Sequence, residues 1–254
     1  MEDTVIDIED DALLWAINKS LDRDYESEVT ITDMEKLNYL SLNDNGIVSL
    51  KGLEYAVNLE YLSVTFCTNM NVEHIRHLTN LKVLSLFNCK IEDISFLSEL
   101  KNLQELYLNY NKISDISVLK GLNFLKVLDL SNNEIYDTTP IQELQSLRKL
   151  DLAANNITDI DSLSVLPNLR YLSLDENNIA DISILGRVNP TIKLSAFNQK
   201  IYISSLNNVT VKAKNGELPK IRPFSSKIAS SKELILGSFA KDMFSGEIIL
   251  AKYI

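Results

Sequence analysis

The sequence predicts an α/β solenoid built from short parallel strands that stack side by side. The first observation is the segment LKVLDLSNNEI at 125–135, whose apolar pattern recurs every 22 residues. The second is its consensus, L-x-x-L-x-L-x-x-N-x-I, which is typical of a leucine-rich repeat. The third is one leucine position that keeps register through eight copies: Leu40, Leu62, Leu84, Leu106, Leu128, Leu150, Leu172 and Leu194.

Each repeat is predicted to contribute one strand and a returning segment. Side chains alternate along a strand, so Leu128 points into the core while Val127 and Asp129 point out onto a concave face. The inner side of a parallel sheet is normally covered, and apolar positions of the returning half also repeat every 22 residues, as at Ile94, Ile116 and Ile160. A stack can bury a face that one coil cannot.

A polar column marks the turn that follows each strand. It holds asparagine in five coils, namely Asn45, Asn111, Asn133, Asn155 and Asn177, and Gln199 in the last. A buried amide there is expected to bond backbone groups that the turn leaves unpaired. Cys67 and Cys89 occupy the column in two coils. Their spacing of about 5 Å permits a disulfide, but we favour two buried thiols because the column directs both side chains into the turn.

Five aspartates form a second column just after the turn: Asp93, Asp115, Asp137, Asp159 and Asp181. We expect them to accept backbone N–H bonds in local turns. They lack the several loop oxygens of a calcium site, and His74 with His77 offers no third metal ligand. No metal and no cofactor is therefore expected.

The N-terminal segment, 1–36, is predicted to be a helical cap over the open end of the stack. Asp10 is the expected N-cap of its helix, and a second helical turn is expected at Asp33–Lys36, beginning from Thr32. Trp15 is expected to pack over the first coil. The apolar stripe of the helix is Leu13 or Leu14, Ile17 and Leu21.

The rest of the chain divides into repeats at 37–201, about eight coils, and a different unit at 202–254. In the latter, IYISS, VTVKA and EIILAKYI alternate like strands, and Asn215-Gly216 is a turn signal. The ends differ in charge: residues 1–36 carry a net −9, and residues 201–254 a net +4. We expect a small β cap at the C-terminal end.

The N-terminal segments IEDDALLWAINKSL and VTITDMEKLNYLSL, followed by GIVSLKGLEYAVNLEYLSV, resemble the cap and first coils of the bacterial internalins. The 22-residue repeat with I-x-D-I, as at Ile113–Ile116, is similar to the internalin type, and the resemblance covers residues 5–200. It implies a helical cap, a curved right-handed solenoid and protein recognition by the concave face. It also implies that the protein is secreted or bound to the bacterial surface, and that an immunoglobulin-like domain follows the repeats. Only about half of such a domain fits in the remaining residues, so we expect an abbreviated form.

The outward strand positions predict a partner-binding surface. Aromatic residues gather toward its N-terminal half and acidic residues toward its C-terminal half. Exposed aromatics in one patch are typical of interface anchors; the alternative is that aromatics merely suit parallel strands and stack on their neighbours. The candidate residues are Tyr61, Phe66, Phe87, Tyr107, Tyr110, Asp129, Asp151, Tyr171 and Asp175.

Composition narrows the class of function. A net charge of −10 disfavours a nucleic-acid partner, and no apolar run is long enough to insert into a membrane. A nucleophile elbow, a phosphate-cradling glycine loop and a metal-ligand cluster are all missing, so we do not expect an enzyme.

We therefore predict a monomeric module that binds a protein partner. The acidic start MEDTVIDIEDD is not a secretory signal. Either a signal has been removed from an exported, surface-associated protein involved in adhesion or virulence, or Met1 is the native start of an intracellular scaffold.

Overall fold

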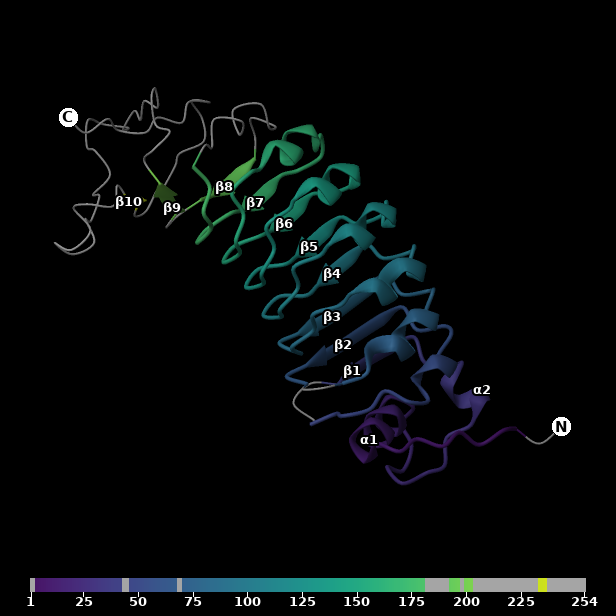
Figure 1. Ribbon diagram of the computed structural model, residues 1–254. Coiled ribbons are helices and arrows are strands. Elements are labelled where there is room, and N and C mark those ends of the chain that lie inside the picture. The colour runs from purple at the N-terminus through teal and green to yellow at the C-terminus, as the bar shows by residue number, and fades with distance from the viewer. Residues whose placement is uncertain are drawn as a thin grey trace, which may run out of the picture.

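The computed structural model is a curved stack of coils with one parallel sheet along its inner side (Figure 1). It describes residues 3–42, 46–67, 70–180, 192–196, 199–202 and 233–236. Each strand of the sheet pairs in parallel with the next strand in the chain. The strands are β1 Tyr39–Leu42, β2 Tyr61–Thr65, β3 Val83–Phe87, β4 Glu105–Tyr107, β5 Val127–Asp129, β6 Lys149–Asp151, β7 Tyr171–Ser173 and β8 Lys193–Ser195.

The register of the sheet follows the sequence period. Leu106 pairs with Leu128 and Leu128 with Leu150, so every strand partner is displaced by one 22-residue repeat. These leucines are fully buried, while Tyr107 and Asp129 face outward and are half-buried. The predicted alternation and the parallel pairing are thus both confirmed.

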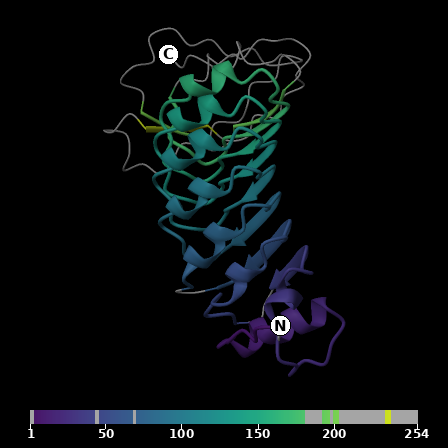
Figure 2. The same ribbon diagram turned by 90° about the vertical axis from the view of Figure 1, so that its right-hand side faces the viewer.

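Short 3₁₀ turns pack over the core-facing side of the sheet and form the convex side of the stack (Figures 1 and 2). Pro140 lies in the first turn of one of them, where its fixed φ suits a helical start. The repeating isoleucines and leucines of these segments are buried against the strand leucines. The turns are η1 Leu53–Tyr55, η2 Val72–His77, η3 Ser95–Glu99, η4 Ser117–Gly121, η5 Thr139–Glu143 and η6 Asp161–Val165.

The N-terminal segment covers the end of the stack next to β1 (Figure 1). Helix α1, Asp11–Ser20, begins as predicted at Asp10, whose carboxylate accepts the N–H groups of Ala12 and Leu13. The second carboxylate oxygen of Asp10 accepts N–H groups of Val48 and Ser49, which ties the cap to the first coil. Leu13 and Ile17 are fully buried, and Trp15, Leu14 and Leu21 pack partly buried against the core.

The second helix begins earlier than the sequence indicated. Helix α2 spans Ile31–Met34, and its N-cap is Thr30, not a residue at Thr32. The reason is a capping box: the Thr30 hydroxyl accepts the Asp33 N–H, and the Asp33 carboxylate accepts the Thr30 N–H. Asp33, assigned by the sequence to the helix start, is thus its third residue.

A ladder of buried amides joins successive coils. Asn133 is typical: its Oδ1 accepts the N–H of Ile113 at 3.0 Å, and its Nδ2 donates to the carbonyls of Leu108 and Leu130, each at 3.0 Å. Equivalent bonds are made by Asn111, Asn155 and Asn177, and Gln199 continues the ladder by accepting the Ile179 N–H. The predicted role of the column is confirmed for these residues; Asn45 lies outside the described residues.

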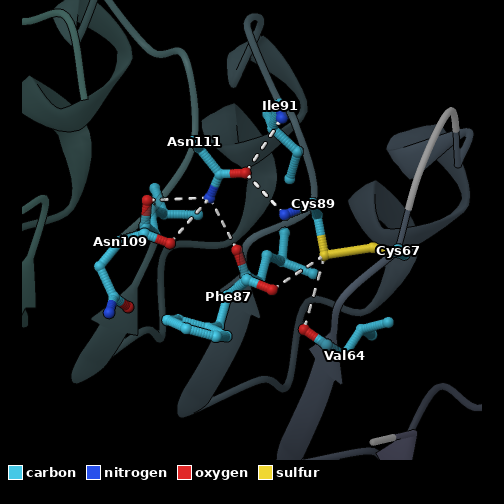
Figure 3. Close-up of a disulfide and its surroundings, with 9 residues drawn as sticks. Val64, Cys67, Phe87, Cys89, Ile91, Asn109 and Asn111 are labelled. Carbon is cyan, nitrogen blue, oxygen red and sulfur yellow. Dashed lines mark hydrogen bonds between the residues drawn. A yellow bond between two sulfur atoms is a disulfide. The ribbon is translucent and has the colours of Figure 1, made fainter. Parts of the chain in front are cut away.

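The two cysteines form a disulfide, so the prediction of two buried thiols is wrong (Figure 3). Cys67 and Cys89 stand in the same column of adjacent coils, with their Cα atoms 4.5 Å apart. That separation lies within the range a disulfide accepts. The shared direction that seemed to keep the thiols apart instead lets the sulfurs of two adjacent turns meet.

The aspartate column caps turns, as predicted. Asp93, Asp115, Asp137 and Asp159 each accept the backbone N–H two residues later at 2.8–2.9 Å. The bond from the Thr139 N–H holds the pKa of Asp137 below its usual range. Asp181 lies outside the described residues.

After β8 the chain forms strand β9, Gln199–Tyr202, which pairs antiparallel with β10, Glu233–Leu236. Most of the unit expected at 202–254 lies outside the described residues. The division of the chain at residues 36 and 201 therefore stays a prediction.

Asn133→Ala should lower the free energy of unfolding by about 2–4 kcal/mol, because the buried groups it bonds would lose their partner. The matched control is Asn132→Ala. Asn132 precedes Asn133 and has the same left-handed φ as Ala154 one coil later, so the repeat accepts alanine at this position. Urea unfolding followed by circular dichroism measures both variants, and equal midpoints would contradict the stabilising role of the ladder.

Candidate functional surface

The candidate residues occupy the outward positions of the sheet and the turns that follow the strands. Tyr61 and Tyr171 begin their strands, while Tyr107, Asp129 and Asp151 lie two residues further along neighbouring strands. Phe87 ends β3, and Phe66 and Tyr110 lie in the turns after β2 and β4. The sheet register brings these residues onto one side of the molecule, the concave face.

Three aromatic rings form a continuous row at the turn side of the concave face. The ring of Phe87 contacts Phe66 edge-on, with centroids 5.1 Å apart, and contacts Tyr110 edge-on at 5.3 Å. Phe66 remains 55% exposed and Tyr110 51% exposed, so most of this apolar surface faces solvent. We call Phe66, Phe87 and Tyr110 the aromatic row.

Two members of the aromatic row have left-handed backbone conformations. φ is +57° at Phe66 and +60° at Tyr110, a region that is uncommon for residues other than glycine. The same conformation recurs at the residue before six ladder positions in the described part of the chain: Phe66, Asn88, Tyr110, Asn132, Ala154 and Glu176. The turn thereby directs this side chain outward, which places Phe66 and Tyr110 on either side of Phe87.

Tyr107 lies at the centre of the face beside acidic groups. Its hydroxyl donates a hydrogen bond to the Glu105 carboxylate at 2.7 Å. Partial burial, followed by the bond to Glu105 and the nearby Asp129 charge, raises the pKa of Tyr107 to about 12. The phenol is thus held neutral and oriented toward Glu105.

Asp129 and Asp151 pair in register on β5 and β6, which makes an acidic pair next to Tyr107. Each accepts a backbone N–H two residues later, at 3.0 and 3.1 Å. Burial and the Asp129 charge raise the pKa of Asp151 above its usual range, against the lowering effect of the Ala153 N–H. A cation placed here by a partner would relieve the repulsion between the two carboxylates.

The other candidates have partners within the face. Tyr61 stacks on Tyr39 with centroids 4.4 Å apart, and the Lys149 ammonium lies 5.5 Å from the centre of the Tyr171 ring. Asp175 accepts bonds from the Ser195 hydroxyl at both carboxylate oxygens, 2.7 and 2.9 Å away. Neighbour stacking, the alternative considered from the sequence, thus occurs; Tyr39 remains 52% exposed, while Tyr61 and Tyr171 are half-buried.

A cleft of about 540 Å³ lies where α1 meets β1. Trp15 and Tyr39 line it together with Lys19 and Lys36, and the Lys19 ammonium lies 4.3 Å from the centre of the Trp15 ring. Lys36 also forms an ion pair with Asp33 at 2.9 Å, so its charge in this cleft is partly neutralised.

Comparisons with known proteins identify the family to which this fold belongs. A family model described as leucine-rich repeats in two copies matches residues 79–121, 101–146, 123–164 and 145–187. The crystal structure of internalin C2 from Listeria monocytogenes is 30% identical, with a TM-score of 0.60, and the match covers 74% of this chain and 93% of that one. The chain belongs to the internalin family of leucine-rich-repeat proteins.

A second internalin of Listeria monocytogenes, InlF, matches at 23% identity with a TM-score of 0.44, and the match covers 76% of each chain. A search among curated proteins found no match. In the described part of this internalin-family chain, no helix is long and apolar enough to cross a membrane. The same residues hold no group of three or more potential metal ligands from histidine, cysteine, aspartate and glutamate.

Sequence reasoning missed several features of this internalin-family surface. Tyr39, Glu105 and Lys149 occupy outward strand positions and contact Tyr61, Tyr107 and Tyr171, but they are not among the predicted site residues. A second asparagine column was also visible: Asn58, Asn80, Asn102 and Asn168 each donate to a carbonyl 23 residues earlier, at 2.8–2.9 Å. The residues with left-handed backbone before the ladder positions could not be recognised by residue type, because asparagine, alanine, glutamate and aromatic residues all occur there.

The raised pKa of Tyr107 has a measurable consequence. Its protonated form is favoured in the folded protein, so its contribution to stability is complete below the ordinary tyrosine pKa of about 10. That contribution should be lost as the pH rises from there through about 12. Tyrosinate absorbance, taken as the difference between wild type and Tyr107→Phe, isolates this group among the ten tyrosines.

Glu105→Gln should lower the pKa of Tyr107, because it removes a charge that opposes tyrosinate, while the effect of burial remains. Lys82→Gln is the control, since Lys82 forms an exposed ion pair with Glu60 elsewhere. An unchanged titration in Glu105→Gln would contradict the assigned cause.

Proposed function

We propose that this protein is a binding module that recognises a protein partner through the concave face of its repeats. The observation that supports this most directly is the aromatic row, whose exposed rings are ordered by contacts with one another. Rigid aromatic side chains lose little entropy on binding and are common energetic anchors of interfaces. Burying them would remove apolar surface that the repeat itself does not need to expose.

The charge on the face specifies the partner's chemistry. Asp129, Asp151 and Asp175 lie along the C-terminal half, and the stack of Tyr39 on Tyr61 lies toward the N-terminal end. The matching partner surface carries basic residues opposite the acidic pair and apolar residues opposite the aromatic row. The family likeness supports protein binding as the class of function, whereas catalysis has no support from the described side chains.

We also propose that the protein works outside the reducing cytosol, as an exported or surface-associated factor in adhesion or virulence. The Cys67–Cys89 disulfide supports this location, because such bonds persist in oxidising compartments and are rare in the cytosol. An intracellular scaffold is the alternative function, but it no longer has the support that free thiols would have given.

Phe87→Ala combined with Tyr107→Ala should reduce partner recovery at least about tenfold, since the loss of two anchors costs about 1.4 kcal/mol or more. The measurement is affinity capture followed by quantitative mass spectrometry. Phe124→Ala combined with Tyr136→Ala is the matched control, because these aromatics are 61% and 65% exposed and lie outside the strands.

A partner supports the proposal only if wild type and the control variant recover it equally and the Phe87/Tyr107 variant recovers less of it. Equal recovery of every partner by the Phe87/Tyr107 variant would contradict concave-face binding. Loss of recovery in the control variant alone would place the interface elsewhere on the molecule.

Asp129→Asn combined with Asp151→Asn should slow association with that partner by roughly three- to tenfold at low salt. The effect should shrink as ionic strength rises. Stopped-flow or surface-based kinetics measure the rate. Glu99→Gln combined with Glu143→Gln is the control for net charge, since both residues end turns on the convex side and are exposed. An equal slowing by both pairs would show an effect of net charge alone.

A further inference from the structure

The turns that carry the aromatic row are closed by two different devices. After β4, the amide of Asn111 closes the turn around left-handed Tyr110 by donating to the carbonyls of Leu108 at 2.9 Å and Asn109 at 3.5 Å. The same amide donates to the Leu86 carbonyl of the preceding coil at 2.7 Å. One side chain thus holds the turn and ties it to its neighbour.

The turns after β2 and β3 have cysteine where this asparagine would stand (Figure 3). The Sγ of Cys89 lies 3.7 Å from the Val64 carbonyl oxygen and 3.5 Å from that of Phe87. These carbonyls lie 25 and 2 residues earlier, the same offsets at which the Asn111 amide donates. The sulfur therefore occupies the place of the amide nitrogen. A bridged sulfur carries no proton and donates no hydrogen bond, so the covalent bond itself joins these coils.

The bridge lies directly behind the aromatic row. Cys67 follows Phe66, which has φ of +57°, and the Phe66 N–H donates to the Phe87 carbonyl at 3.0 Å. Left-handed backbone at a residue with a side chain persists only where the surroundings enforce it. Around Phe66 no ladder amide supplies that constraint, because position 67 itself is a cysteine.

We propose that the Cys67–Cys89 disulfide is a covalent replacement for two rungs of the amide ladder, and that it positions the aromatic row for partner binding. The row then has its binding geometry only in the oxidised protein. This inference rests on the proposed function for the role of the row, but its test needs no partner. Cys67 and Cys89 are positioning residues and make no contact with the partner, since they are 2% and 4% exposed.

Reduction is the direct perturbation. A dithiol such as dithiothreitol transfers two electrons and two protons to the Cys67–Cys89 bond, giving two thiols, and becomes a cyclic disulfide itself. Because the sulfurs are buried, reduction requires the turn to open or a mild denaturant pulse followed by refolding. Counting thiols with a chromogenic reagent establishes the redox state of each sample.

Two double variants separate the covalent bond from the ladder function. Cys67→Ser with Cys89→Ser removes the bridge and provides no amide. Cys67→Asn with Cys89→Asn removes the bridge but introduces the side chain that makes the ladder bonds in four other described coils. Dithiothreitol acts on neither variant, so both also control for effects of the reagent.

The readout is limited proteolysis with chymotrypsin, which cleaves after aromatic residues in locally opened segments. Cleavage after Phe66 and Phe87 should rise about tenfold in reduced wild type and in the serine variant, as a loss of about 1.4 kcal/mol in closure free energy would produce. The asparagine variant should stay within about twofold of oxidised wild type. Cleavage after Phe124, exposed in a coil that keeps its ladder, should not change in any sample.

Circular dichroism melting separates local from global effects. Unchanged cleavage after Phe66 in the reduced protein would overturn the proposal, and so would failure of the asparagine variant to restore protection. Equal acceleration at Phe66 and Phe124, or complete unfolding on reduction, would make the bridge a general stabiliser and would equally overturn a positioning role. If reduction accelerates cleavage as expected but the Phe87/Tyr107 variant captures every partner as well as wild type does, the positioning role of the disulfide is retained and the concave-face binding site is rejected.

Discussion

The structure depends on how each coil is tied to the next after its strand ends. The chain must turn there, and the turn takes a left-handed residue at Phe66, Tyr110 and their equivalents. Unpaired backbone groups in this buried turn would each cost about 1–3 kcal/mol. The ladder amides pair these groups and join neighbouring coils. Asn133, for example, accepts the Ile113 N–H and donates to the Leu108 carbonyl, both in the preceding coil.

The same constraint produces the surface. In the six coils where the turn is described, it directs the residue before the ladder position outward and so offers a row of side chains with fixed direction, whatever their chemistry. In most coils this residue is small or polar, but in the second and fourth it is Phe66 or Tyr110. With Phe87 between them, a structural requirement of the repeat becomes an ordered aromatic surface.

The disulfide follows the same logic by different chemistry. From the sequence, Cys67 and Cys89 look like tolerated replacements for asparagine, and two buried thiols would serve as weak donors to the same carbonyls. The structure joins them instead, because equivalent positions of adjacent coils stand 4.5 Å apart at Cα. A sequence period gives that adjacency, but the bond depends on the direction of each Cα–Cβ vector, which spacing does not reveal.

The amino-acid sequence alone determined the coil length, the strand register, the core leucines and the cap at Asp10, because each follows from local periodicity or local hydrogen bonding. It also determined which side chains face outward. Only the tertiary structure decided which of them touch: that Phe87 joins Phe66 and Tyr110, and that Tyr107 turns to Glu105. Contacts between coils depend on rotamers and turn geometry summed over neighbouring repeats, and that information belongs to the stack as a whole.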